Sequence, residues 1–171
     1  LAYWRVGPHE INYRRFFDVT GLISLRIEDP SVFAATHELA FKLIRDGKVT
    51  GLRIDHPDGL WDPKMYFDRL QDAFHHIDPS RDLFVVVEKI LSDGEKLPED
   101  WNVSGTTGYD YLNYANGVFV AQENEAQFSE IYSQFTGEPA DYSAVEYEAK
   151  KFVLENLFPR EVNALTERFR Q

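Results

Sequence analysis

Two short apolar runs that each end in a carboxylate constrain the fold of this chain more than any other feature. Residues 49–55 end at Asp55, and residues 83–88 end at Glu88. The residues between the two runs carry apolar side chains at helical spacing, which predicts a helix. A strand, a helix and a second strand joined by short linkers are typical of a right-handed βαβ unit in a parallel sheet. The sequence therefore predicts an α/β fold with parallel strands.

Two Asp-Pro pairs mark the starts of the predicted helices. Asp29-Pro30 and Asp62-Pro63 each place a capping side chain before a proline, which is tolerated in the first helical turn. Residues 91–117 are rich in loop-forming residues, and the pattern beyond them becomes helical. We predict that residues 1–120 form a domain that carries both strand-end acids. Residues 121–171 are expected to form a mainly helical insertion or subdomain.

The composition excludes several classes of partner. The 171-residue chain has a formal net charge of −11 and no cysteine. Nucleic acids and anionic membranes bind clustered Lys and Arg, so neither is an expected partner. A thiolate zinc site and a disulfide framework are excluded, and no apolar run approaches the roughly 18 residues of a membrane span. We expect a soluble, cytoplasmic protein. Because the chain begins with Leu in mid-pattern, we also expect it to be a piece of a larger one.

The two strand-end acids suit the chemistry of glycosidic bonds. Arg53 and Asp55 lie on one face of their strand because successive side chains point to opposite faces, and an Arg near an Asp lowers the pKa of that Asp. Retaining glycosidases place two carboxyl groups about 5–5.5 Å apart, and adjacent strands are about 4.8 Å apart. Asp55 is then the expected nucleophile. Glu88, expected among the apolar residues 85–87, is the expected general acid and base.

Three other interpretations stay open on these residues alone. Strand-end carboxylates also serve as helix caps or as partners in ion pairs. A divalent metal site is a rival chemistry, with Asp55, His56, Asp58 and Glu88 as its ligands. A noncatalytic scaffold, either a structural or a glucan-binding module, is the third interpretation. His37 lies on the apolar stripe of its helix, and we interpret it as a packed histidine rather than a ligand.

The motifs around both acids resemble those of a known family. Gly51-Leu-Arg-Ile-Asp-His56 resembles the nucleophile segment of the α-amylase superfamily (glycoside hydrolase family 13), and Val86-Val-Glu-Lys-Ile-Leu91 resembles its acid/base segment. Longer strings are similar to a trehalose-forming branch of that superfamily; they cover residues 3–7, 10–18, 51–60 and 105–110. The resemblance covers residues 1–120 closely and the helical tail more loosely.

The resemblance implies an activity and a set of site residues. It implies a retaining intramolecular transglucosylase that converts the reducing-end α-1,4 bond of a maltooligosaccharide into an α,α-1,1 bond, without a cofactor or a metal. Asp55 would be the nucleophile, Glu88 the acid and base, and Arg53 the group that keeps Asp55 charged. Candidates for substrate contacts are His56, Asp58, Glu10, Tyr13, Arg14, Trp61 and Tyr109. Another α-amylase-type hydrolase or transferase is the alternative enzyme.

The chain also departs from the superfamily pattern. The third catalytic Asp and the first sugar-binding motif of the superfamily are missing from the sequence, and a complete barrel needs about 250 residues. We therefore expect a partial TIM (β/α)8 barrel with parallel strands at 49–55 and 83–88, a third carboxylate outside this chain, and no activity of the chain alone. Open parallel strand edges pair with other chains unless they are covered, so self-association is expected as well.

Overall fold

A computed structural model describes residues 3–92, 94–139 and 141–170 of the chain. Contacts divide the chain into two compact units. One comprises residues 25–120, and the other comprises the residues up to Ser24 together with those from Ala121 onward. Each unit is described by itself.

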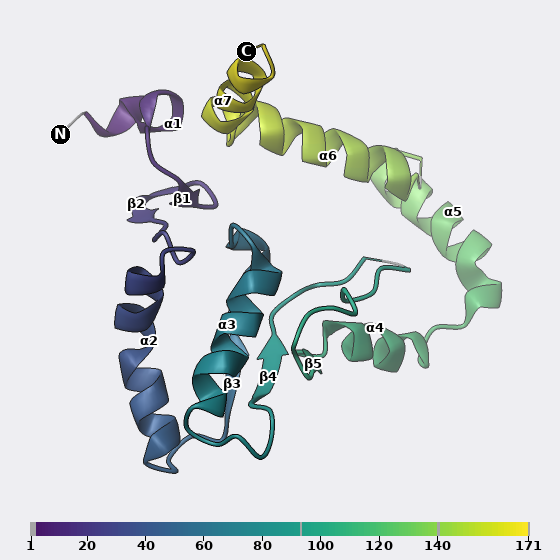
Figure 1. The fold of residues 1–171 in the computed structure, drawn as a ribbon. Helices are drawn as coiled ribbons and strands as arrows, with labels where there is room; N and C mark the ends of the chain where they lie inside the picture. Colours follow the sequence, from purple (N-terminus) through teal and green to yellow (C-terminus); the bar gives the residue numbers. More distant parts are fainter. Residues whose placement is uncertain (1–2, 93, 140, 171) are drawn as a thin grey trace. The chain divides into compact units, whose positions relative to one another are not determined.

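The unit of residues 25–120 is built on a three-stranded parallel sheet (Figure 1). The strand order is β3-β4-β5, and Arg53 pairs with Val86 and Ile54 with Val87 across the first two strands. In chain order its elements are α2 (Pro30–Arg45), β3 (Gly51–Ile54), the 3-10 turn η2 (Pro57–Gly59), α3 (Pro63–His75), β4 (Phe84–Val87), β5 (Gly105–Thr106) and α4 (Tyr109–Gly117).

Local sequence explains where both long helices of this unit begin and where α2 ends. The carboxylate of Asp29 accepts a hydrogen bond from the backbone N–H of Ser31, and that of Asp62 accepts one from Met65, so each helix start has the predicted cap. A proline follows each cap in the first turn. Gly47 follows α2 with a φ of 66°. This left-handed conformation is unfavourable for residues that have a side chain, and a glycine there is a common way for a helix to end.

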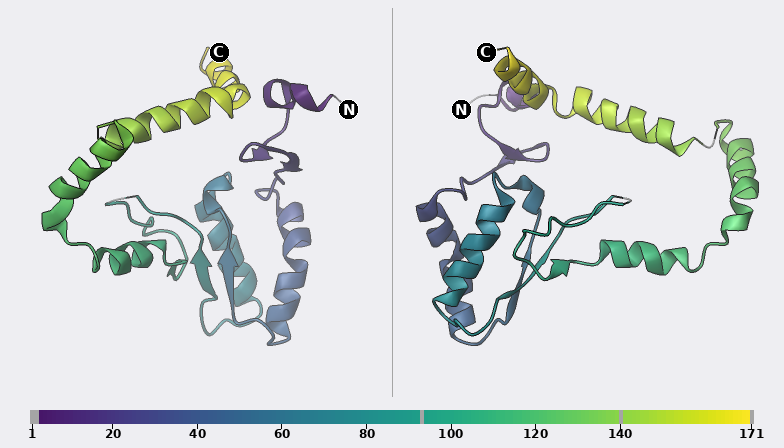
Figure 2. Two further views of the ribbon diagram at one scale, coloured as in Figure 1. Left: turned by 180° about the vertical axis from the view of Figure 1, so that it is seen from behind. Right: turned by 45° about the vertical axis from the view of Figure 1, so that its right-hand side comes forward.

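The core lies between the sheet and its helices. Val85 and Val87 are fully buried, as are Phe67, Leu70 and Phe74 of α3. Strand parity places residue 86 and residue 53 on the opposite face of the sheet. The left view in Figure 2 shows the strands from the side opposite α3, and no helix in the described part of this unit covers the strands there. One face of the sheet thus carries the core and the other carries Arg53.

A buried glutamine joins α3 to the sheet. The side-chain amide of Gln71 donates hydrogen bonds to the carbonyls of Leu83 at 3.0 Å and of Asn102 at 3.1 Å. Its oxygen accepts a hydrogen bond from the backbone N–H of Leu83 at 2.9 Å. The side chain of Gln71 thus supplies hydrogen-bond partners to backbone groups at the beginning of β4. Each of these groups, if buried without a partner, would cost about 1–3 kcal/mol of stability.

The other unit pairs the N-terminal residues with the C-terminal helices. Arg15 is buried, and its guanidinium binds Glu161 at 2.9 Å and the carbonyl of Leu157 at 2.7 Å. Its elements are η1 (Trp4–Val6), α1 (Gly7–Glu10), the antiparallel strands β1 (Arg15–Phe16) and β2 (Val19–Ile23), η3 (Gln122–Asn124), α5 (Glu125–Thr136), α6 (Tyr142–Asn156) and α7 (Pro159–Phe169).

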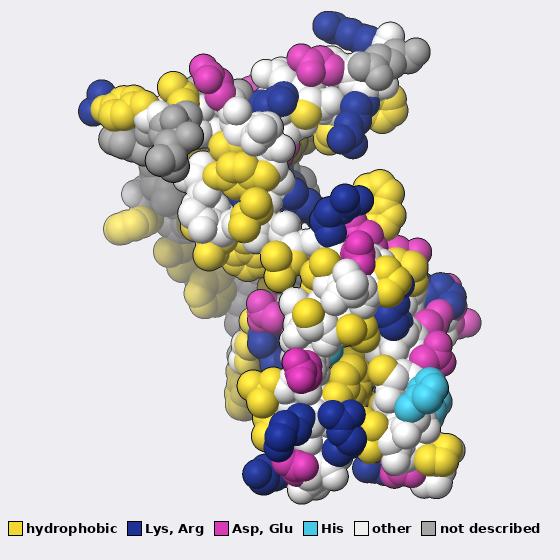
Figure 3. Space-filling view, turned by 60° about the vertical axis from the view of Figure 1, so that its left-hand side comes forward, with side chains coloured by type: hydrophobic (Ala, Val, Ile, Leu, Met, Phe, Trp, Pro, Cys, Tyr) yellow, Lys and Arg dark blue, Asp and Glu magenta, His cyan; other side chains and the backbone are white. Residues whose placement is uncertain are grey.

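Charged side chains of both signs and hydrophobic side chains share the surface. On the face shown in Figure 3, Lys and Arg lie among Asp and Glu, with hydrophobic side chains between them. Large apolar side chains are exposed in both units, with Phe119 and Phe135 each 89% exposed. Among the described residues, no helix is both long and apolar enough to cross a membrane.

The prediction of an α/β fold with parallel strands is confirmed, and the element bounds differ in detail. The expected strands 49–55 and 83–88 are observed as the shorter β3 and β4. The strand β5 was not predicted, because Gly105 and Thr106 lie in a stretch that reads as loop. The two contact units are residues 25–120 and the remainder, in which residues up to Ser24 group with the C-terminal helices. The predicted division into residues 1–120 and 121–171 stays a prediction.

Candidate active site

The register of the sheet brings Asp55 and Glu88 to the same rim. Ile54 pairs with Val87, and each acid is the next residue along its strand. The backbone N–H of Glu88 donates to the carbonyl of Ile54 at 2.8 Å, so the parallel ladder continues to the acid itself. The two carboxyl groups therefore lie on neighbouring strands at their carboxyl ends, as the sequence predicted.

One guanidinium group joins the two acids. Arg53 Nη1 lies 2.8 Å from Asp55 Oδ1, and Arg53 Nη2 lies 3.2 Å from Glu88 Oε1. The side chain of Asp55 is 60% exposed and that of Glu88 only 26% exposed. A cation shared by two carboxyl groups lowers the repulsion between them. Asp55 is thus the more accessible of the two acids, and Glu88 is the more enclosed.

The pKa of Asp55 lies below its ordinary value. The largest cause is a hydrogen bond with the carboxyl of Glu88, and the hydrogen bond and positive charge of Arg53 add to it. Glu88 and Arg53 thus both favour the anionic form of Asp55. The sequence predicted the contribution of Arg53 but not that of the second acid.

The surroundings of Glu88 differ from the sequence prediction. Apolar residues were expected around its carboxyl group, but Val85 and Val87 are buried on the α3 face of the sheet. Strand parity turns Glu88 the other way, toward Arg53 and the backbone N–H of His56, which lies 3.3 Å from Glu88 Oε2. Hydrogen-bonding groups, rather than an apolar pocket, thus contact the carboxyl group of Glu88.

His56 makes a sharp turn directly after Asp55. Its φ of 46° and ψ of 57° are left-handed, which is uncommon for a residue with a side chain. A side chain at Gly59 would stand 2.6 Å from the imidazole ring, so glycine is required for the close approach. The turn aims the backbone N–H of His56 at Glu88.

Lys89 ties together the loops that follow β3 and β4. Its ammonium group lies 3.2 Å from Asp58 Oδ2 and 3.0 Å from Glu95 Oε1, and its side chain is largely buried. Asp58 was predicted to contact substrate, and here it pairs with Lys89. Sequence reasoning missed Lys89, and the signal available was its position directly after Glu88. Among the residues that the structure describes, no group of three His, Asp or Glu could hold a metal ion.

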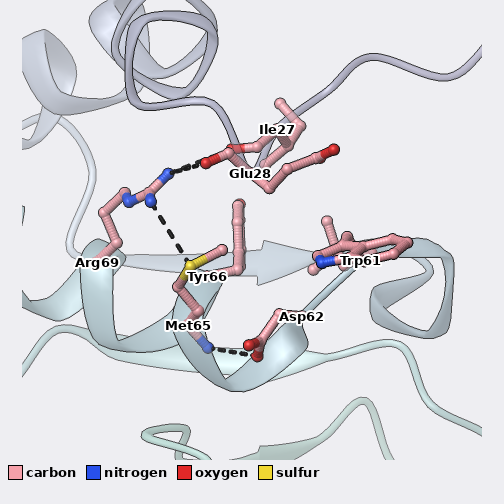
Figure 4. A pocket seen from close by; sticks show the side chains of 8 residues that line it. Ile27, Glu28, Trp61, Asp62, Met65, Tyr66 and Arg69 are labelled. Carbon is pink, nitrogen blue, oxygen red and sulfur yellow. Dashed lines mark hydrogen bonds between the residues drawn. The ribbon is translucent and has the colours of Figure 1, made fainter.

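Trp61 borders a small depression whose lining includes neither of the two acids (Figure 4). The cavity holds about 10 Å³, about enough for one water molecule and too small for a sugar ring. Its polar contacts are internal, since Arg69 donates to the carbonyl of Glu28 and the carboxylate of Asp62 caps α3. The indole of Trp61 itself is exposed. A role for Trp61 in stacking on sugar stays a prediction.

The remaining predicted residues lie apart along the chain. Tyr109 begins α4 after Gly108, whose φ is 93°, and it is partly exposed. Three others belong to the other unit, where Glu10 ends α1, the Tyr13 hydroxyl donates to the carbonyl of Thr20, and the Arg14 carbonyl accepts from Ser24. Their roles in substrate binding stay predictions.

His37 is a packed histidine, as the sequence predicted. Its imidazole stacks on Phe33 with a centroid distance of 4.1 Å, and its Nε2 lies 2.8 Å from the hydroxyl of Tyr66. Burial lowers the pKa of His37 and raises the pKa of Tyr66 to about 12. The hydrogen bond between His37 and Tyr66 joins α2 to α3. Among the described residues, the hydrogen-bond partners of His37 are Phe33, Thr36 and Tyr66, and neither acid is one of them.

Comparisons with known proteins point to one kind of enzyme. No protein-family model matches the chain. Over 131 residues it is 39% identical to a protein of Mycobacterium tuberculosis assigned as a maltooligosyl trehalose synthase, a match that covers 77% of this chain and 16% of that protein. The solved maltooligosyltrehalose synthase of Arthrobacter ramosus is 37% identical with a TM-score of 0.85, over 94% of this chain and 20% of its own.

A further solved structure agrees. It is a glycosyltrehalose synthase, 42% identical with a TM-score of 0.83, and the match covers 93% of this chain and 21% of that one. The chain therefore matches one segment of these synthases in sequence and in fold. It spans about one fifth or less of the length of the relatives named here.

Proposed function

We propose that the chain is part of a maltooligosyl trehalose synthase of the α-amylase superfamily, a retaining intramolecular transglucosylase that acts on maltooligosaccharides. The observation that carries this proposal is the pair of carboxyl groups at the ends of β3 and β4, joined by Arg53. The similarity to synthases over most of the chain supports the choice of reaction. A cytoplasmic location stays a prediction.

In the first half of the reaction, Asp55 acts as the nucleophile. Its carboxylate attacks the anomeric carbon of the glucose next to the reducing end, and the bond from that carbon to O4 of the terminal glucose breaks. Glu88 donates its proton to O4 as the bond breaks, so the terminal glucose leaves neutral. The product is a glucan joined covalently to Asp55, together with one free glucose that has not left the site.

In the second half, the released glucose returns as the nucleophile. It turns over and presents its anomeric hydroxyl to the glucan on Asp55. Glu88, now a carboxylate, accepts the proton of that hydroxyl, its oxygen attacks the anomeric carbon of the intermediate, and Asp55 is freed. The new bond is α,α-1,1. Water in the same position would give hydrolysis, so retention of the glucose by a closed, polar pocket decides the product.

The proposal includes a barrel to which this chain contributes one part. In it, β3, β4 and β5 are parallel strands of a (β/α)8 barrel, residues 1–120 belong to the catalytic segment, and residues 121–171 are a helical subdomain. Supporting this, the chemistry of such barrels lies at the carboxyl ends of their strands, where both acids stand. A third carboxylate would come from outside this chain, so the segment alone is inactive. Self-association through the open edges of the sheet stays a prediction.

Incubation with maltopentaose tests the proposed function. The full-length protein should convert it into a product of the same mass that has lost its reducing end, whereas the 171-residue chain alone should leave it unchanged. Release of reducing sugar by the full-length protein would instead indicate an α-amylase-type hydrolase. Binding of maltopentaose without turnover would indicate a glucan-binding module. Either result contradicts the proposal, and a product made by the short chain contradicts its inactivity.

Replacing Arg53 by Leu should change the pH dependence of the reaction. Arg53 lowers the pKa of Asp55, so removing Arg53 should raise that pKa. On acidification, Asp55 would then become protonated at a higher pH than in the original protein. The acidic limb of the pH profile of kcat/KM, which reports the essential base of the free enzyme, should therefore move to higher pH. Arg45→Leu, an exposed change on α2, should keep the original limb. An unmoved limb in the Arg53 variant would refute the pairing.

A further inference from the structure

A groove of about 550 Å³ is lined by the segment after β4, by β5 and by α4. Its volume is within the roughly 300–1,000 Å³ of typical small-molecule sites. Glu95, Lys96 and Leu97 line it on one side, and Asp110, Asn113 and Tyr114 line it on the other. The first wall belongs to the segment after β4, and the second is one face of α4. All these residues belong to the unit that contains the acids.

Two links connect the groove to Glu88. Lys89, the next residue, holds Glu95 of the first wall by an ion pair of 3.0 Å. Thr106 also lines the groove, and it pairs with Val87, the residue before Glu88, in the parallel sheet. The groove is therefore linked to the two residues that flank Glu88 in the chain.

The lining of the groove fits a neutral, hydroxylated ligand. The ring of Tyr114 is 77% exposed and offers a flat apolar surface, and the amide of Asn113 can both donate and accept hydrogen bonds. The hydroxyl of Thr106 donates to Asp110 at 2.6 Å, and that hydrogen bond lowers the pKa of Asp110 and keeps it anionic. With Glu95 also present, Lys96 is the one cation among the described residues of the lining, which disfavours phosphate and other anions.

We propose that this groove binds glucose units of the maltooligosaccharide beyond the first three, counted from the reducing end. Tyr114 stacks on a sugar face, and Asn113 contacts its hydroxyl groups. The ion pairs of Lys89 with Glu95 and Asp58 hold the first wall in place relative to both catalytic strands. The inference rests on the proposed function, and it adds that the preference for chain length is set by α4 and the segment after β4.

A matched pair of tyrosines on α4 tests the groove. In the full-length protein, Tyr114→Ala should raise KM for maltohexaose about five- to tenfold, while kcat stays near the original value and the kinetics with maltotriose are unchanged. Tyr111→Ala is the control, because Tyr111 is 74% exposed on the same helix and does not line the groove. It should leave both substrates unaffected. Asn113→Ala should show the same length-dependent increase in KM as Tyr114→Ala, to a smaller extent.

Several results would overturn the groove proposal without affecting the proposed function. They are equal KM values for Tyr114→Ala and Tyr111→Ala, an increase in KM that is the same for maltotriose and maltohexaose, or a lowered melting temperature without any dependence on substrate length. The last result would mean that the Tyr114 side chain packs against another part of the full-length protein rather than against sugar. Failure of the unmodified full-length protein to rearrange either substrate would instead refute the proposed function itself.

Discussion

Replacing Asp55 by Asn in the full-length protein should abolish turnover of maltooligosaccharides while leaving their binding intact. The amide has nearly the same shape as the carboxylate but cannot form the covalent glycosyl ester. Removal of a nucleophile typically lowers kcat by about 10⁴–10⁶-fold. Turnover is measured by the loss of reducing ends from maltopentaose, and binding by calorimetry on the same preparation. Retained affinity separates a lost chemical step from a lost fold.

The control for this change is Asp72→Asn. Asp72 is an exposed residue on α3, and the loss of its charge should leave turnover within about twofold, as for surface changes away from a site. An Asp55→Asn protein that keeps more than a small fraction of the original kcat would mean that another group attacks the sugar. A protein that binds maltopentaose equally well before and after the change, with no turnover in either form, would be a glucan-binding module.

Replacing Glu88 by Gln should lower turnover of maltooligosaccharides by about 10²–10⁴-fold, the usual contribution of a positioned proton donor. The size of the loss should depend on the leaving group. Fluoride leaves without being protonated, so a maltosyl fluoride should still form the intermediate on Asp55 at close to the original rate. The fluoride released in the first turnover, followed with an ion-selective electrode, measures this step separately from the later transfer.

Glu99→Gln is the matched control for Glu88, because it removes an exposed carboxylate in the loop after β4. It should leave the rates with both kinds of substrate unchanged. If the Glu88 variant lost activity equally toward maltopentaose and maltosyl fluoride, its carboxyl group would be needed for something other than proton donation. Support of the hydrogen bonds with Arg53 and Asp55 would then be the alternative role.

The parts of the fold that depend on local signals could be predicted from the sequence. Caps at Asp29 and Asp62, with a proline after each, placed the starts of α2 and α3, and apolar runs placed β3 and β4. The strand β5 could not be predicted, because two residues carry no periodicity of their own. Nor could the grouping of Arg15 with α7, since no local pattern encodes a contact across 146 residues.

The same distinction holds for the candidate site. Strand parity alone put Arg53 beside Asp55, and the structure shows that contact. The contact of Arg53 Nη2 with Glu88 could not be predicted in this way, because it depends on the register between two strands that are far apart in the sequence. The environment of Glu88 was predicted wrongly because a run of valines suggested an apolar setting. The same parity that buries two of them turns the acid to the polar side.

The left-handed turn at His56 sets a limit on how this protein could be made more robust. A residue with a side chain in that conformation costs of order 1–3 kcal/mol, and glycine or asparagine would reduce the cost. Libraries screened for heat resistance alone would thus favour replacements at position 56. Glycine in the same left-handed conformation would keep the backbone N–H directed at Glu88. It would remove the imidazole, a candidate substrate contact, so the more stable protein would be a slower catalyst.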